Sequence, residues 1–156
     1  MLELLVVGAS FFGQGNWVCS YHYDYPEQNV REAFVNHVQY SKDLSYIASG
    51  KIIYSHPGNK EPFAQFSYND SGIANILGNQ FYLQGHVVDV TKDFDKENHF
   101  KDGYTKEILE FLNNPIPIEE KTLTVLSRTT QRMVVKHEKS GTVTECDAAT
   151  YEIPDI

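Results

Sequence analysis

The sequence predicts a mainly β fold, an antiparallel meander of about 8–10 strands that closes into a barrel and carries one helix. Three observations predict it. Apolar and polar residues alternate along many short runs, turn residues separate these runs, and 13% of the residues are aromatic, which favours pleated, half-buried surfaces. A chain of 156 residues with 41% hydrophobic content can bury one core, so residues 1–156 are expected to form a single domain.

The first clear strand begins at Gly15 and contains the only tryptophan of the chain. Alternation gives one of its faces four residues: Trp17, Cys19, Tyr21 and Tyr23. This face is apolar and aromatic, as expected of a strand that lines the inside of a sheet or barrel.

The middle of the chain continues as strands separated by tight turns. Strands are predicted, in order, over residues 35–40, 44–55, 63–68, 73–77 and 80–91. The connections include a turn at 69–72, where Asn, Asp, Ser and Gly follow one another, and a hairpin turn at 78–79. Gly50 lies inside a long strand and predicts a bulge or bend there.

Residues 92–103 are densely charged and predict an exposed loop. The run 93–97 resembles the opening of a calcium loop, but the sixth position is not glycine and the twelfth, Tyr104, is not an acid. We therefore expect no metal site here.

Residues 104–113 predict the single helix, because their apolar residues share a stripe and Pro115 follows. The stripe consists of Tyr104, Ile108, Phe111 and Leu112. This helix is expected to pack across the sheet or close one of its ends. Three final strands are predicted over 122–127, 131–138 and 142–148, with a tight turn at 139–141.

Charge and the N-terminal segment limit the partners. A net charge of −8 and the lack of a basic run argue against nucleic acid. Residues 1–12 are apolar but too short to span a bilayer, and Glu3 stands where an export signal has basic residues. The glycines that follow do not have dinucleotide-site spacing, so no cofactor is predicted.

Gly15-Asn16-Trp17 at the start of an early strand, the meander, the helix and the late hairpin together resemble the lipocalin-like (calycin-type) barrels, in particular divergent bacterial members. The helix precedes the last three strands, unlike in the classical family. The resemblance implies that Trp17 closes one end of the barrel and that an arginine from a late strand, Arg128 or Arg132, stacks over it. It also implies a small apolar ligand inside the barrel, without catalysis.

The two cysteines, Cys19 and Cys146, become neighbours if the first and last strands of such a barrel pair. A disulfide there would close a long loop and, in the chain-entropy model, would stabilise the folded state by roughly 4–5 kcal/mol. It would also favour a periplasmic or secreted location. Two buried free thiols are the equal alternative.

Three functions follow from these observations. The first is a carrier or sensor of a small apolar or aromatic molecule, and its predicted cavity lining is Tyr21, Tyr23, Tyr46, Tyr54 and Phe81. The second is a protein-binding module, of inhibitor or immunity type, that presents the acidic run Asp93–Asp102 to a basic protein. The third is a small barrel enzyme, for which paired carboxylates such as Asp24 and Asp89 are candidates.

Overall fold

The computed structural model describes residues 15–149, and in it eight antiparallel strands form one sheet in sequence order. The sheet closes on itself as a barrel because the last strand pairs with the first. The strands are β1 (Gly15–Tyr25), β2 (Val30–Tyr40), β3 (Ser45–Ser55), β4 (Pro62–Leu77), β5 (Gln80–Asp95), β6 (Leu123–Arg128), β7 (Arg132–His137) and β8 (Val143–Ala148). The predicted mainly β meander is confirmed, whereas the expectations for residues 1–12 and 151–156 lie outside the described residues.

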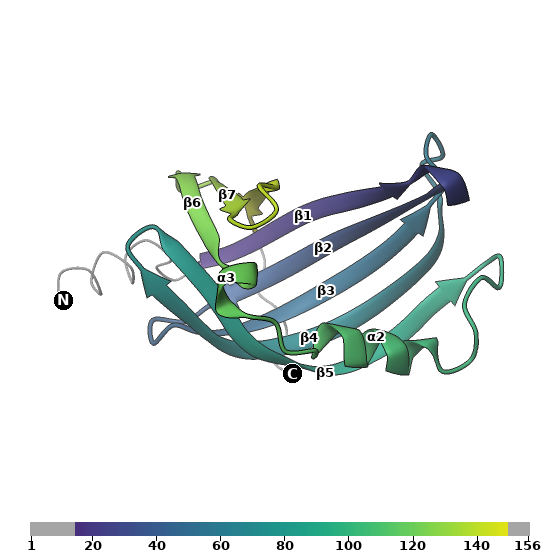
Figure 1. The fold of residues 1–156 in the computed structure, drawn as a ribbon, viewed down its shortest axis with the longest axis horizontal. Coiled ribbons are helices and arrows are strands. Elements are labelled where there is room, and N and C mark those ends of the chain that lie inside the picture. The colour runs from purple at the N-terminus through teal and green to yellow at the C-terminus, as the bar shows by residue number, and fades with distance from the viewer. Residues whose placement is uncertain (1–14, 150–156) are drawn as a thin grey trace.

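The sheet is closed at one end only. Neighbours among β1 to β5 pair over most of their lengths, but β8 joins β1 only at Trp17–Ser20, and β6 joins β5 only at Gln80 and Phe81. Figure 1 shows the five long strands side by side, with β6 and β7 gathered at one end. We call the part completed by β6–β8 the closed end and the opposite part, beside α2, the helix end.

The helix predicted at 104–113 is confirmed as α2 (Tyr104–Leu112), which lies along β5. Tyr104, Ile108 and Leu112 pack against the core of the helix end, as predicted. The prediction was wrong for Phe111, which is 73% exposed, because Leu109 completes the buried stripe instead. Two single turns, η1 (Pro26–Gln28) and α3 (Ile118–Lys121), accompany α2.

The side chain of Asn113, directly after α2, binds the edge of β5 that β6 does not reach. Its Oδ1 accepts the Val87 N–H at 2.8 Å, and its Nδ2 donates to the Val87 carbonyl at 2.9 Å. Asn113 thereby takes the place of a neighbouring strand and anchors the helix to the sheet.

The turn predicted at 69–72 is wrong, because β4 runs continuously through these residues and they pair with β5. Their turn-type composition coincides with a bulge in the β4–β5 pairing between Asn69 and Asp70. Ser71 pairs with His86 directly after it. Asp70 is acceptable inside a strand because its side chain has a hydroxyl partner, Tyr46, on the inner face of the sheet.

Two further expectations need correction. Gly50 makes no bulge; it pairs in register with Asn36 and Tyr68. The loop predicted at 92–103 begins later, since β5 continues to Asp95. The Asp95 carboxylate then accepts the N–H groups of His99 and Phe100, and this turn directs the Phe100 ring into the core.

The interior contains two hydrophobic clusters. One, at the closed end, is built around Trp17, Tyr46, Phe81 and Met133. The other, at the helix end, is built around Phe66 and includes residues of α2. Within residues 15–149, no helix has both the length and the apolar character needed to cross a membrane.

Candidate functional site

A cavity of about 440 Å³ lies at the closed end. Its walls come from the inner faces of β1 to β5 and from β6 to β8, and α3 contributes Lys121 at the rim. Aromatic and sulfur-containing side chains form much of the lining: Cys19, Tyr21, Tyr23, Tyr40, Tyr46, Tyr68, Phe81, Met133 and Cys146. This volume is in the range of small-molecule sites.

Four of the five residues predicted to line a ligand cavity do line it: Tyr21, Tyr23, Tyr46 and Phe81. The fifth, Tyr54, lies at the helix end, where its ring contacts Phe66 and Phe100. Alternation placed Tyr54 on the correct face of β3, but it could not show that α2 fills the space above that part of the strand.

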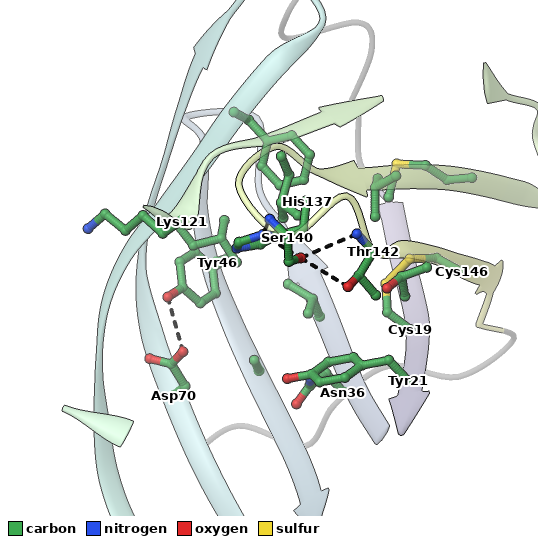
Figure 2. Close-up of a pocket in the computed structure, with 18 of the residues that line it drawn as sticks. Cys19, Tyr21, Asn36, Tyr46, Asp70, Lys121, His137, Ser140, Thr142 and Cys146 are labelled. Atoms are coloured by element: carbon green, nitrogen blue, oxygen red, sulfur yellow. Dashed lines mark hydrogen bonds between the residues drawn. A yellow bond between two sulfur atoms is a disulfide. The ribbon is translucent and has the colours of Figure 1, made fainter. Parts of the chain in front are cut away.

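Two polar pairs form a layer inside this mostly aromatic lining. The Tyr46 hydroxyl donates to Asp70 Oδ2 at 3.1 Å, and the Tyr68 hydroxyl donates to Asn36 Oδ1. Figure 2 shows the Tyr46–Asp70 hydrogen bond, and it also shows Tyr21 and Asn36 in the lining of the same cavity. Sequence reasoning missed both Asp70 and Tyr68. Asp70 lay in the expected turn, and Tyr68, two residues before it on β4, faces the same side of the sheet.

Two glycines make room for these pairs. At Gly85, a Cβ atom would lie 1.9 Å from the Tyr46 hydroxyl oxygen and 2.8 Å from Asp70 Oδ1. At Gly50, a Cβ atom would lie 2.1 Å from Cζ of Tyr68. At these positions glycine is needed because a larger side chain would overlap Tyr46 or Tyr68, and not because the strand bends.

Burial controls the ionisation of the lining. Burial raises the pKa of Asp70, an effect that outweighs the lowering by the Tyr46 hydroxyl and by the nearby Ser71 and His86 backbone N–H groups. Burial, with the Tyr23 hydroxyl and Glu32 nearby, raises the pKa of Tyr21 to about 12. The cavity thus contains neutral phenols and one half-buried carboxyl group.

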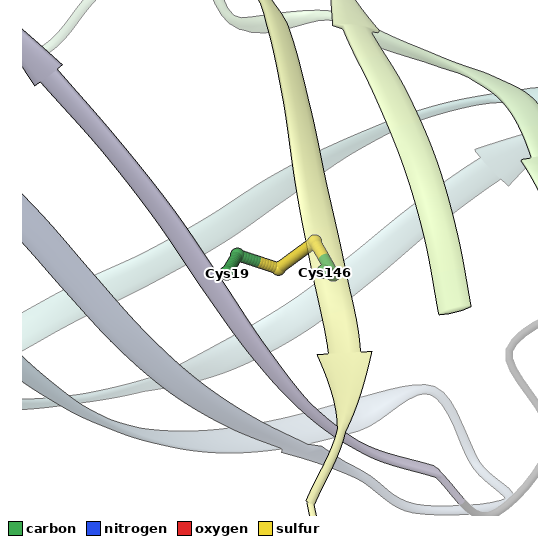
Figure 3. Close-up of a disulfide and its surroundings, with 2 residues drawn as sticks. All are labelled: Cys19 and Cys146. Atoms are coloured by element: carbon green, nitrogen blue, oxygen red, sulfur yellow. A yellow bond between two sulfur atoms is a disulfide. The ribbon is translucent and has the colours of Figure 1, made fainter. Parts of the chain in front are cut away.

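A disulfide joins the two strands that close the ring. Cys19 of β1 and Cys146 of β8 are directly paired across the strands, and their sulfur atoms are bonded (Figure 3). Of the two alternatives for these cysteines, the disulfide is therefore the one observed. Both residues also line the cavity, so the bond is part of its wall.

Arg128 is the arginine that lies over Trp17, with its guanidinium carbon 5.5 Å from the ring centroid. Burial lowers the pKa of Arg128, although the group stays cationic at physiological pH. Arg132, the other candidate, forms an ion pair with Glu145 on the neighbouring strand β8.

The rim of the cavity carries polar groups with partners of their own. Lys121 Nζ lies 5.2 Å from the centroid of the Tyr82 ring, on the outward-facing side of β5. Ser140 Oγ lies 2.9 Å from both His137 Nδ1 and Thr142 Oγ1, and the Ser140 N–H also donates to that nitrogen. These bonds lie within the β7–β8 connection and stabilise that turn.

Several residues named for the two alternative functions have partners within the protein. In the acidic run, Asp93 accepts from Ser67, and Glu97 pairs with His56. The structure does not bring Asp24 and Asp89 together: Asp24 forms an ion pair with Arg31, and Asp89 accepts from Asn69 on β4.

Comparison with known protein families and with curated proteins found no match for this chain.

Proposed function

We propose that this protein binds a small apolar or aromatic molecule in the closed-end cavity, as a carrier or sensor of lipocalin-like type, without chemical conversion. The observation that carries the proposal is the cavity itself, about 440 Å³ inside a domain whose other end is filled by its own side chains. Interior packing is normally close to crystal density, so an unfilled volume of this size points to an occupant.

The lining supports binding in preference to catalysis. Asp70 supplies the half-buried carboxyl group that an enzyme would need, but its side-chain partner is Tyr46, a phenol whose pKa burial raises further. A phenol of this kind exchanges protons poorly near neutral pH. The disulfide fits an oxidising compartment, and we propose a periplasmic or secreted location on that ground.

Fluorescence titration with N-phenyl-1-naphthylamine, a neutral aromatic probe, tests the proposal. We expect saturable binding by the wild-type protein. Ala48→Phe places a ring in the cavity and should weaken binding at least about tenfold. Ser49→Phe is the matched control, because Ser49 is the next residue on β3 and faces the other side of the sheet. Absent binding, or equal loss in both variants, would refute the proposal.

A further inference from the structure

Asp70 forms no ion pair within residues 15–149, although its carboxyl group is half-buried. A positive charge on His86 lowers the pKa of Asp70, but by less than burial raises it. The lysine of the cavity rim, Lys121, has its ammonium over the outward-facing Tyr82 ring. Removing a carboxylate from water without a counter-charge costs free energy. A cation that entered the cavity would offset this cost.

A cation in the cavity could contact the Asp70 carboxyl group through one of its two oxygens. Its Oδ1 is buried near Gly85 and the backbone N–H groups of Ser71 and His86, whereas Asp70 as a whole lines the cavity. Oδ2 is the oxygen that accepts from Tyr46, which also lines the cavity, so Tyr46 occupies one of its acceptor positions. A carboxylate oxygen has a second lone pair, so Oδ2 can accept another donor.

The surroundings of Asp70 also favour a cation. The cavity wall includes Tyr40, Tyr46, Tyr68 and Tyr21, and the Tyr40 and Tyr46 ring centroids lie 6.2 Å apart. The faces of aromatic rings attract ammonium groups, with the strongest effect where water is excluded. These rings also provide the apolar contact area for the hydrocarbon part of a ligand.

We propose that the ligand is a small aromatic or aliphatic amine, bound as its ammonium ion, with the charged group on Asp70 Oδ2 and the hydrocarbon part among the tyrosine rings. This inference rests on the proposed function, because it names the chemical class of the molecule in the same cavity. It also makes a ligand with a carboxylate head unfavourable, since that group would meet the negative charge of Asp70.

Three compounds with one phenyl ring and similar chains test the inference: 2-phenylethylamine, 2-phenylethanol and 3-phenylpropanoate. Displacement of N-phenyl-1-naphthylamine and calorimetry give their affinities for the wild-type protein at pH 7. We expect the amine to bind at least about tenfold more tightly than the alcohol, and the carboxylate to bind most weakly.

Asp70→Asn removes the charge but keeps the shape and an acceptor for Tyr46. It should abolish the preference for the amine and leave the affinity for the alcohol within about twofold. The matched control is Asp89→Asn, which removes an exposed carboxylate from β5 and should retain the preference. A preference that survives Asp70→Asn, or that is lost equally in Asp89→Asn, would overturn the inference.

The wild-type ligand series decides the question even if Asp70→Asn does not fold. If the probe binds but the amine is no tighter than the alcohol, the amine inference is wrong and the proposed function stands. If neither the probe nor any of the three compounds binds, both are wrong.

Discussion

The closed end and the helix end are built on the same strands, yet one contains a cavity and the other is filled. At the helix end, α2 and the segment before it place Tyr104, Ile108 and Phe100 on the inner face of the sheet, against Phe66. At the closed end, strands β6 to β8 complete the ring, and the cluster that contains Tyr46, Phe81 and Met133 leaves a cavity of about 440 Å³.

The difference shows how this fold separates stability from binding. Where the ring is incomplete, a helix can lie on the sheet and supply core side chains, with Asn113 satisfying the free edge of β5. Where the ring is complete, the strands satisfy each other's backbone groups and a covalent bond links β1 to β8. The closed end can therefore contain a cavity, and four measurements test this interpretation.

The largest effect is expected from removing the disulfide. Cys19 and Cys146 are 127 residues apart, so the Cys19→Ala/Cys146→Ala variant should lose about 3–5 kcal/mol of unfolding free energy in a denaturant titration. Hydrogen exchange should show protection lost first in β6 to β8, while the Phe66 cluster stays protected. A uniform loss along the chain would contradict a closed end that depends on this bond. The reduced wild-type protein is the control.

One substitution placed at both ends compares their packing directly. Ala64→Leu adds three carbon atoms to the filled helix end, where Ala64 is 0% exposed, and should cost about 1–3 kcal/mol. Ala48→Leu adds the same atoms to the wall of the cavity and should change stability by less than about 0.5 kcal/mol. Urea titrations measure both values. Equal losses would mean that the cavity collapses in solution.

The two arginines near the closed end should differ by a smaller amount. Arg128→Met removes the half-buried guanidinium over Trp17 and should cost about 0.5–2 kcal/mol. Arg132→Met removes an ion pair in which both side chains are more than half exposed, so a loss of at most about 1 kcal/mol is expected. Thermal melts of both variants test the order. A larger loss for Arg132 would show that the contact with Trp17 does not hold the closed end.

The smallest expected change in stability comes from Asp70 in the ligand-free protein. Burial raises its pKa in the folded state, so ionisation destabilises the fold, and this cost grows as the pH rises from about the ordinary value of 3.8 through the raised pKa. The melting temperature of Asp70→Asn should therefore be higher than that of the wild type at pH 7, by at most about 4 °C. Below pH 3.8 the two proteins should melt at the same temperature. Asp89→Asn, at an exposed site, should show no such pH-dependent gain. A lower melting temperature for Asp70→Asn at pH 7 would contradict the cost assigned to the charge.

Sequence reasoning predicted the parts of the fold that local pattern determines. Period-two alternation placed Trp17 and Tyr21 on the inner face, and apolar spacing located α2 to within a residue. The same reasoning was wrong at 69–72, where Asn, Asp, Ser and Gly are typical of a turn but lie inside β4. Composition could not show that Asp70 has a hydroxyl partner on β3.

The candidate site was predictable only in part, for a physical reason. Tyr46 and Tyr54 lie on the same face of β3 and are equivalent in the sequence, but only Tyr46 borders the cavity. Which of them faces empty space depends on where α2 lies and where β6 joins β5, and both are long-range contacts.

The amino-acid sequence by itself determined the β meander, the helix and an aromatic inner face, because alternation, helical spacing and turn residues act over a few neighbouring positions. Only the tertiary structure decided that Cys19 meets Cys146, that Arg128 lies over Trp17, and that Asp70 stands in a hollow among tyrosine rings. These features depend on the register in which distant strands close the sheet, and no local pattern specifies that register.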